Sequence, residues 1–331
     1  MRAVDIKGGT GNANALFIDE NAPVPTPGDG ELLVRVKAFG LNRMDVMQRE
    51  GKYMLPPQAP KTLGVEFSGV VESLGEGAPD FKIGDEVFGL AYGGAYAEYI
   101  AVSGKMCIHK PKELSWEQAA GVPETWITAT QALWSVGGFK PGDRVLIHAG
   151  ASGVGIAAIQ LAKAHGAAAV YTTASSQEKI DFCVKELGAT AGFNYKTQDF
   201  GEEILKATDG KGVDLIIDPV GQSHLQKDVN CAAKDGRIVL LAMMSGAVVK
   251  ELNLAQILFK RLRIEGSTLR SRDLEYQQAL RDKVVAEVLT GMESGSFKVF
   301  VEKVFSWKDI VDAHKLMESN ETRGKIICIV D

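Results

Sequence analysis

Hydrophobic and polar positions give the two halves of the chain different textures. Up to about residue 122, short apolar runs such as ELLVRVKAFG, FSGVVESLG and YAEYIAV alternate with Gly, Pro and Asp, which is typical of β-strands joined by turns. Apolar strands then alternate with amphipathic helices; in SQEKIDFCVKELG, for example, the apolar residues from Ile180 to Leu187 recur at helical spacing. This alternation predicts a parallel sheet covered by helices on both faces.

The C-terminal tail, from about residue 264, is too small to form a domain of its own. It predicts one long helix, RDLEYQQALRDKVVAEVLTGM, then a strand near VFVEKVF, a helix and a final strand, KIICIV. We therefore expect an α/β protein in which residues 1–124 begin a β-rich domain, residues 125–263 form a doubly wound parallel sheet, and residues 264–331 return to complete the first domain.

The segment RVLIHAGASGVGIAAIQLAK, residues 144–163, has the pattern of a strand, a turn of small residues and a helix. It almost matches G-x-G-x-x-G, with Ser152 in place of the middle glycine. Glycines there let a pyrophosphate approach the N–H groups of the helix N-terminus. The sequence predicts a dinucleotide-binding turn, with an ordinary strand-to-helix turn as the alternative. The predicted contacts are Gly150, Ser152, Gly153, Val154 and Gly155.

Ser152 has two interpretations. It is a small residue whose hydroxyl caps the helix, or its hydroxyl faces the cofactor or the reacting group.

The end of the next strand indicates which dinucleotide binds. Sites for NAD usually carry an acid there, on the ribose hydroxyl. This strand ends YTTASSQEK, so Ser175, Ser176 and Lys179 stand where an acid would select NAD. Serine hydroxyls, a lysine ammonium and the N–H groups of a helix N-terminus can all donate hydrogen bonds to a phosphate, which favours NADPH. A solvated helix cap with a surface lysine is the alternative.

Composition and charge narrow the class of protein. The 331 residues are 45% hydrophobic with a formal charge of −5, which argues against nucleic acid or an anionic membrane as partner. The apolar run from Ile238 to Val249 is too short to span a bilayer, and the N-terminus lacks the apolar region of a signal peptide. The four cysteines are scattered without C-x-x-C spacing, so we expect reduced thiols in a cytoplasmic protein.

Several segments in order resemble a known family. GLNRMDVMQREGKY, LGVEFSGVVESLG, GDEVFGL, GGAYAEY, HAGASGVGIAAIQLAK and GATAGFNY are similar to the zinc-free quinone oxidoreductase branch of the medium-chain dehydrogenase/reductase superfamily. FKRLRIEGSTLRSRD and AHKLMESNETRGKI most resemble its tumour-suppressor-inducible group. The resemblance covers nearly the full length. It implies a GroES-like catalytic domain with an inserted Rossmann domain, NADPH between them, and a homodimer.

The resemblance also implies roles for single residues. Asn42, Tyr53 and Thr128 match positions near the nicotinamide and substrate, so Asn42, Tyr53 and Ser152 are the candidate catalytic residues. Ser176, Lys179 and Tyr195 match positions around the adenosine 2′-phosphate. Further matches to cofactor contacts are Met243, Met244, Ser245, Leu269 and Asn320.

Each of these residues has a structural alternative. Tyr53 could pack on neighbouring prolines, and Asn42 could be a turn residue. Thr128 could only start a helix. Met243 and Met244 could fill the core at the end of a strand.

The positions of the zinc ligands in related alcohol dehydrogenases are changed here. A cysteine would stand near Asn42 and a histidine at Val65, and the lobe of four close cysteines is missing. We therefore expect no metal. Reduction of an unactivated ketone usually needs a Lewis acid, whereas a conjugated acceptor delocalises the developing charge. This favours a quinone or an enone as the substrate.

The leading hypothesis is an NADPH-dependent quinone reductase, with an enone or enoyl reductase as the alternative enzyme. A non-catalytic NADPH-binding protein is the third possibility, because members of the branch also serve as lens crystallins or bind RNA. The apolar run GRIVLLAMMSG, with LRIEGSTL beyond it, could end the parallel sheet in an edge strand, which would favour a homodimer.

Overall fold

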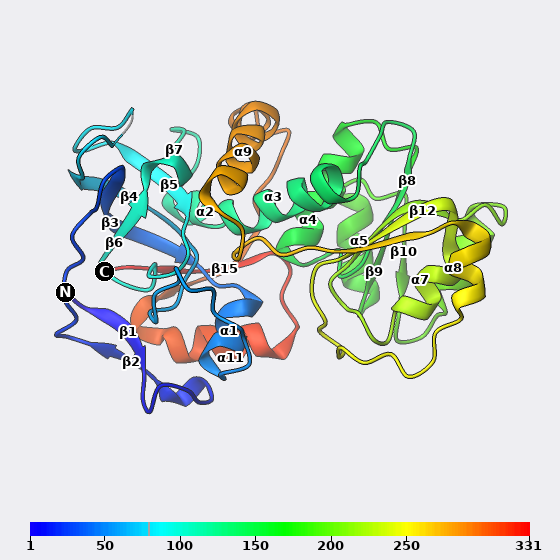
Figure 1. Ribbon diagram of the computed structural model, residues 1–331, viewed down its shortest axis with the longest axis horizontal. Helices are drawn as coiled ribbons and strands as arrows, with labels where there is room; N and C mark the ends of the chain where they lie inside the picture. The colour runs from blue at the N-terminus through cyan, green and yellow to red at the C-terminus, as the bar shows by residue number, and fades with distance from the viewer. Residues whose placement is uncertain (79) are drawn as a thin grey trace. The chain divides into compact units, whose positions relative to one another are not determined.

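The computed structural model describes residues 1–78 and 80–331, and its chain forms two compact units (Figure 1). The first unit contains Met1–Ile127 and Arg270–Asp331, and the second contains Thr128–Leu269. The C-terminal segment from Arg270 therefore belongs to the first unit. The return comes later than the predicted residue 264, because the strand Arg263–Gly266 belongs to the sheet of the second unit.

The first unit is built on a largely antiparallel sheet in the order β14-β15-β3-β4-β5-β7, with β6 also paired to β3. A separate hairpin joins β1 and β2. The strands are β1 (Ala3–Ile6), β2 (Leu16–Asp19), β3 (Glu31–Gly40), β4 (Glu66–Leu74), β5 (Glu86–Leu90), β6 (Tyr99–Ser103), β7 (Cys107–His109), β14 (Val301–Ser306) and β15 (Lys325–Ile329).

The helices of this unit are short, apart from those of the returning tail. They are α1 (Arg43–Arg49), α2 (Trp116–Ala120), α3 (Pro123–Thr130, which crosses the boundary), α9 (Leu274–Val284), α10 (Thr290–Glu293) and α11 (Ile310–Ser319). The π-helical turn Val285–Leu289 joins α9 to α10, so the single long helix predicted for the tail is continuous but irregular.

The second unit has a parallel sheet of six strands in the order β10-β9-β8-β11-β12-β13. Numbered along the unit this is 3-2-1-4-5-6, the Rossmann order, whose switch point lies between β8 and β11. The elements are β8 (Arg144–Ile147), α4 (Gly153–Ala164), β9 (Ala169–Ala174), α5 (Gln177–Lys185), β10 (Ala191–Asn194), α6 (Phe200–Ala207), β11 (Val213–Asp218), α7 (Leu225–Cys231), β12 (Ala232–Leu240), α8 (Leu254–Lys260) and β13 (Arg263–Gly266).

Each unit has its own hydrophobic core. In the first, Phe39, Phe67 and Trp307 are fully buried between the sheet and the returning segment. In the second, Leu146 and Ile216 of neighbouring strands pack in the core that also includes residues of α6 and α7. The fold is therefore α/β, with a β-rich unit and a Rossmann sheet.

Candidate functional site

The predicted dinucleotide turn follows β8 and opens α4. Ser152 is the N-cap of this helix, and its Oγ accepts a hydrogen bond from the N–H of Gly155 over 3.1 Å. In the described part of the chain, the N–H groups of Gly153 and Val154 have no acceptor. The first turn of a helix carries partial positive charge, so these donors fit a phosphate.

Two glycines of the turn are required by close packing. A Cβ at Gly150 would lie 1.9 Å from Oγ1 of Thr172 on β9. A Cβ at Gly155 would lie 2.5 Å from the carbonyl oxygen of Ala149. The turn is therefore pressed against the sheet and its own preceding strand, which is the geometry that brings backbone N–H groups to the surface.

The candidate 2′-phosphate residues come together at the carboxyl ends of β9 and β10. Ser176 is the N-cap of α5 and accepts from the N–H of Lys179 over 3.3 Å. The N–H of Tyr195 donates to the carbonyl of Ala174 over 3.3 Å, which places Tyr195 beside Ser175. Both serines and Lys179 are half-buried, so a ligand can reach them. These strand ends contribute hydroxyl and ammonium groups and no acid.

The loop after β12 lies near the switch point. Ser245 donates to the carbonyl of Val220 and accepts from the N–H of Ser223, so it ties this loop to the one after β11. Met243 is 61% exposed and Met244 50%, so the alternative that they fill the core is wrong.

The remaining candidates are more dispersed. Thr128 lies within α3, so the alternative that it starts the helix is also wrong. Leu269 is buried and presents little surface. Asn320 ends α11 in the first unit, and its Oδ1 accepts from Arg43 over 2.6 Å.

The first unit holds Asn42 in a buried polar network. Its Nδ2 donates to Oε1 of Glu66 over 2.9 Å, and its Oδ1 accepts from Nζ of Lys325 over 2.8 Å. Lys325 also forms a 2.6 Å ion pair with Glu66 and donates to the carbonyl of Leu41. Asn42 begins α1, but its side chain points into this network, so it is more than a turn residue.

Strand pairing explains why residues so far apart in sequence meet. β3 is antiparallel to both β4 and β15, so its C-terminal end lies beside their N-terminal ends. Asn42 follows the first of these ends, and Glu66 and Lys325 begin the other two strands. Gly40 leaves room for the network, since a Cβ there would lie 2.3 Å from Oε1 of Glu66.

A second buried group continues from α1. Asp45 accepts hydrogen bonds from the N–H of Asn42, the N–H of Gly64 and the hydroxyl of Tyr96. Burial raises the pKa of Asp45 to about 6, and the hydrogen bonds oppose the rise. The hydroxyl of Tyr96 also contacts Nε2 of His314, which extends the group to α11.

Tyr53 lies under a guanidinium. The Arg270 side chain is centred 5.4 Å from the Tyr53 ring, and it donates to the carbonyl of Tyr92 and to Gln48. Arg270 is buried, yet its Nη2 has no hydrogen-bond partner in the part of the chain that the structure describes. Burial, followed by the charge of Glu124, raises the pKa of Tyr53, so this phenol stays neutral near pH 7.

Sequence reasoning missed Glu66, Glu124 and Lys325. The N–H of Glu124 donates to Oε2 of Glu66 over 2.9 Å. Burial, followed by the Glu66 charge, raises the pKa of Glu124 to about 7. The signal available in the sequence was charge in apolar surroundings: Glu66 in LGVEFSGVV and Lys325 in GKIICIV.

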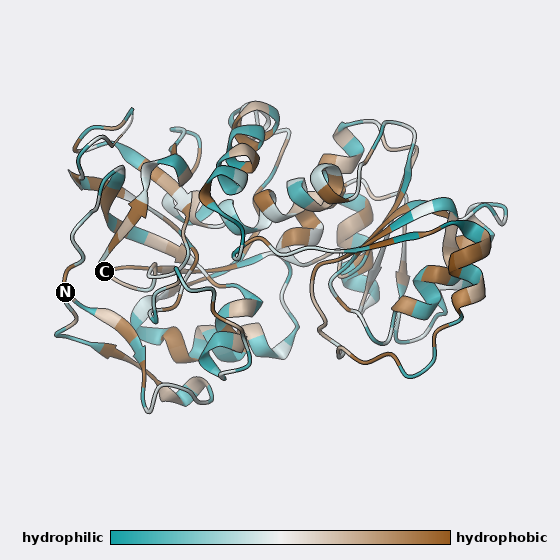
Figure 2. Ribbon diagram, viewed as in Figure 1, coloured by the Kyte–Doolittle hydropathy of each residue, from teal (hydrophilic) through white to brown (hydrophobic). Residues whose placement is uncertain are grey.

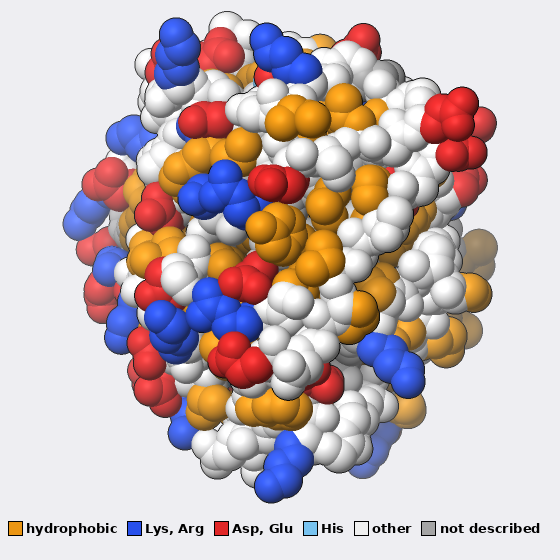
Figure 3. All heavy atoms as spheres, turned by 90° about the vertical axis from the view of Figure 1, so that its left-hand side faces the viewer, with side chains coloured by type: hydrophobic (Ala, Val, Ile, Leu, Met, Phe, Trp, Pro, Cys, Tyr) orange, Lys and Arg blue, Asp and Glu red, His pale blue; other side chains and the backbone are white. Residues whose placement is uncertain are grey.

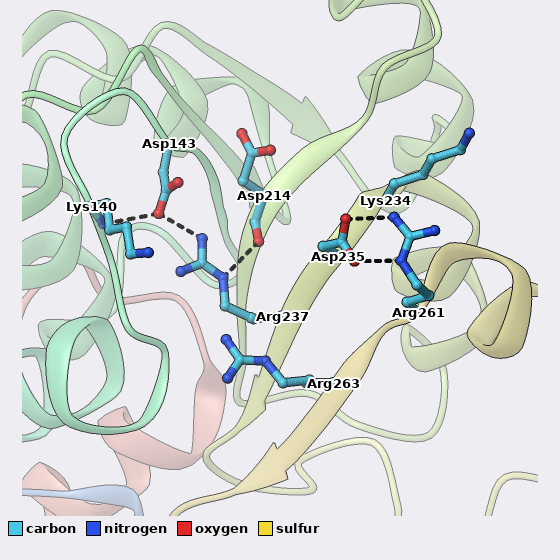
Figure 4. Close-up of a pocket in the computed structure, with 8 residues that line it drawn as sticks. All are labelled: Lys140, Asp143, Asp214, Lys234, Asp235, Arg237, Arg261 and Arg263. Carbon is cyan, nitrogen blue, oxygen red and sulfur yellow. Dashed lines mark hydrogen bonds and ion pairs between the residues drawn. The ribbon is translucent and has the colours of Figure 1, made fainter.

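The opposite end of the Rossmann sheet carries more charged side chains, but most of them form ion pairs with one another. A recess of about 430 Å³ is lined by basic and acidic side chains (Figure 4). Arg237 pairs with Asp143 over 2.6 Å, and Arg261 with Asp235 over 2.6 Å. These pairs lie at the amino ends of the strands, away from the dinucleotide turn, and partly cancel the recess's charge.

Possible metal ligands do not form clusters in the part of the chain that the structure describes. Among residues 1–78 and 80–331, no group of three or more His, Cys, Asp or Glu side chains could hold an ion. Cys107 is buried and His109 exposed on β7, so they do not form a pair. All four cysteines are buried and free.

The surface carries charges of both signs. On the face shown in Figure 3, acidic and basic side chains are interspersed with hydrophobic ones. No helix in the described part is both long and apolar enough to cross a membrane.

Comparison with known families identifies two matching regions. Residues 28–112 match the alcohol dehydrogenase GroES-like domain, and residues 153–284 match the zinc-binding dehydrogenase family. A human synaptic vesicle membrane protein VAT-1 homolog is 31% identical over 99% of this chain and 86% of its own length. A pig quinone oxidoreductase is 31% identical over 97% of this chain and 95% of its own length.

Solved structures agree with this assignment. An NAD-dependent alcohol dehydrogenase has 33% identity and a TM-score of 0.87, covering 100% of both chains. Escherichia coli quinone oxidoreductase complexed with NADPH has 29% identity and a TM-score of 0.88, covering 100% of both chains. CurK enoyl reductase has 29% identity and a TM-score of 0.85, covering 100% of this chain and 99% of its own. The protein is therefore an oxidoreductase of the medium-chain dehydrogenase/reductase superfamily, with quinone oxidoreductases among its relatives.

Proposed function

We propose that this chain is an NADPH-dependent quinone reductase that transfers hydride directly to its acceptor without a metal. The observation that carries the choice of cofactor is the grouping of Ser175, Ser176, Lys179 and Tyr195 at adjoining strand ends without an acid. A 2′-phosphate offers charge-assisted hydrogen bonds to such groups, whereas a ribose hydroxyl would call for a carboxylate. The likeness to a quinone oxidoreductase bound to NADPH supports the same choice.

In this proposal the turn of the second unit binds the cofactor. The N–H groups of Gly153 and Val154 donate hydrogen bonds to the pyrophosphate. Ser152 keeps α4 capped, and its exposed hydroxyl lies beside the ligand. The loop with Met243, Met244 and Ser245 lines the same end of the sheet. Leu269 supports the site only through packing, and Asn320 and Thr128 are secondary contacts. Bound NADPH supplies the hydride.

The first unit supplies the acceptor's polar surroundings. Asn42 is fixed at both ends of its amide, and the neutral hydroxyl of Tyr53 can donate to a developing oxyanion. The Nη2 of Arg270 is a further donor beside Tyr53. A quinone spreads the charge over its ring, so hydrogen bonds can replace a Lewis acid. The quinone oxidoreductases among the relatives support this acceptor.

The test is stopped-flow oxidation of NADPH with ortho-quinones, para-quinones and an enone. Rapid turnover with quinones and slow turnover with the enone is expected. Turnover of the enone alone would establish the alternative, an enoyl or enone reductase, which the likeness to CurK enoyl reductase favours. Binding of NADPH with no turnover of any acceptor would leave a non-catalytic dinucleotide-binding protein. Neither result would fit the quinone reductase.

We also propose that the chain forms a homodimer in the cytoplasm. β13 is an edge strand of the Rossmann sheet. The neighbouring α8 is coloured largely hydrophobic in Figure 2, and its Leu254, Leu258 and Phe259 are each 68–71% exposed. A second copy that pairs with the edge would cover both features. The four free cysteines fit a reducing compartment. Sedimentation at micromolar concentration should give a dimer, and Leu258→Glu should give a monomer. A monomeric wild type would refute the dimer.

A further inference from the structure

Glu124 lies at the start of α3, inside the polar network that holds Asn42. Its N–H donates to one oxygen of Glu66, whose other oxygen binds Asn42 and Lys325. The residue as a whole is half-buried, and its carboxyl is desolvated by burial. The charged and titratable groups around it come from α1, the loop after α1, β4, the start of the returning segment and β15. They are Asp45, Tyr53, Glu66, Arg270 and Lys325.

The charges of this group do not balance. Three carboxyls, those of Asp45, Glu66 and Glu124, share the site with two cations, Lys325 and Arg270. An excess negative charge in a mostly buried site is removed most cheaply when one acid keeps its proton.

Two of the three acids have partners that favour their charged form. Glu66 forms a 2.6 Å ion pair with Lys325, and Asp45 accepts from two backbone N–H groups and a tyrosine hydroxyl, so both are bonded as anions. The pKa values agree with this assignment. Burial, followed by the Glu66 charge, raises the pKa of Glu124 to about 7. Burial raises the pKa of Asp45 to about 6.

We propose that the Glu124 carboxyl holds a proton beside Asn42 and Tyr53 and delivers it to the reduced acceptor, an inference that rests on the proposed quinone reduction. Hydride transfer gives the quinone two electrons and one hydrogen, which leaves a hydroquinone anion. The O–H bond of Glu124 then breaks as the O–H bond of the neutral hydroquinone forms. The carboxylate takes its next proton from water. Tyr53 is a poor source of this proton because its pKa is raised, and it serves as a hydrogen-bond donor.

The experiment compares Glu124→Gln, which keeps the shape of the protonated acid, with Glu124→Asp, which keeps an acid. Glu113→Gln is the matched control, because Glu113 is exposed and lies outside the network. The wild-type kcat with a quinone should fall as the pH rises through about 7. Glu124→Gln should lower kcat roughly 10²-fold on the acid side, the lower end of what a positioned general acid contributes, and abolish this pH dependence. Glu124→Asp should restore part of both.

A second readout does not depend on turnover. The folded pKa of Glu124 lies above the unfolded value of 4.5, so the folded state binds the extra proton between pH 4.5 and about 7. The contribution of this bound proton to the stability of the folded state is fully present below that interval, and it is lost as the pH rises through it. Denaturant unfolding of the cofactor-free chain should therefore show Glu124→Gln gaining stability relative to wild type from about pH 5 to about pH 8.

The outcomes separate the two proposals. Quinone turnover by Glu124→Gln with an unchanged pH profile would overturn the role of Glu124 and leave the quinone reductase intact. A pH-independent stability difference between Glu124→Gln and wild type would overturn the stored proton. If the wild type reduces no acceptor, the proposed function fails, and proton delivery fails with it.

Discussion

The polar groups of the network around Asn42 in the first unit are bonded to one another, whereas the dinucleotide turn of the second unit leaves backbone donors open. The Asn42 amide is bonded at both ends, and Lys325 donates to three oxygens. In contrast, the N–H groups of Gly153 and Val154 have no acceptor in the described chain. One site is a closed buried network, and the other is an open set of backbone donors at a helix end.

This difference predicts where substitutions act. Removal of one partner from a closed buried network leaves another charge unpaired, so the cost falls on folding. Removal of a donor from an open surface leaves the folded protein nearly unchanged, so the cost falls on ligand affinity. Stability and cofactor binding, measured side by side, should therefore separate the two sites.

The largest effect is expected for Lys325→Met. It leaves the Glu66 carboxylate buried beside Asn42 without its ammonium, since both side chains are almost completely buried. The free energy of unfolding should fall by about 3–5 kcal/mol. Urea denaturation of the cofactor-free chain measures this loss.

Lys105→Met is the control for Lys325→Met, because Lys105 is exposed. It should change stability by less than about 0.5 kcal/mol. Adding Glu66→Gln to Lys325→Met should recover part of the loss, because it removes the unpaired charge. A loss for Lys325→Met no greater than that for Lys105→Met would show that Glu66 does not depend on Lys325 for its charge balance.

Gly150→Ala should disturb the second unit at its turn. The new Cβ would lie 1.9 Å from Oγ1 of Thr172, so the strand and the turn must separate. We expect about 1–3 kcal/mol of lost stability together with weaker NADPH binding. Calorimetric titration and urea denaturation measure the two losses. Gly266→Ala is the control, since a Cβ there has no atom within 4 Å. Normal binding by Gly150→Ala would show that close packing at this glycine does not shape the turn.

The second unit was predictable because its signals are local in sequence. The turn, the helix cap at Ser176 and the strand end at Ser175 each lie within a few residues, and parallel pairing of β9 with β10 then adds Tyr195. The apolar run GRIVLLAMMSG, with LRIEGSTL beyond it, had suggested an edge strand in this region, and the edge strand of the sheet is β13. The boundary before β13 was misplaced because a short strand of the sequence RIEG carries no periodicity to mark its sheet.

The first unit's site could be predicted only in part. Asn42 and Tyr53 came from a family resemblance, whereas Glu66, Glu124 and Lys325 were missed. These three residues meet Asn42 through the register of an antiparallel sheet, and a single sequence does not reveal which strand ends adjoin. The sequence shows that a charged residue stands within an apolar run, but it does not show which residue pairs with that charge.

Lys179→Ala tests the open site with a smaller effect. A charge-assisted hydrogen bond to a 2′-phosphate is worth roughly 1.5–3 kcal/mol, so NADPH should bind about ten- to a hundredfold more weakly. NADH should bind nearly as before, because it has no 2′-phosphate for the ammonium to contact. Fluorescence titration with both cofactors gives the comparison. Equal losses for NADPH and NADH would show that Lys179 does not select the phosphate.

The smallest effect is expected for Tyr53→Phe, which probes the accessible edge of the closed network. The substitution keeps the ring under the Arg270 guanidinium and removes only the hydroxyl. One hydrogen bond to the developing oxyanion is worth about 0.5–1.5 kcal/mol, so kcat with a quinone should fall about two- to tenfold. Affinity for NADPH should stay nearly constant, because the proposed phosphate contacts lie in the second unit. Tyr53→Leu is the companion variant, since it also removes the ring on which Arg270 packs and should raise KM as well. If Tyr53→Phe weakened NADPH binding as much as it slowed turnover, Tyr53 would belong to the cofactor site, and the division between a closed acceptor site and an open cofactor site would fail.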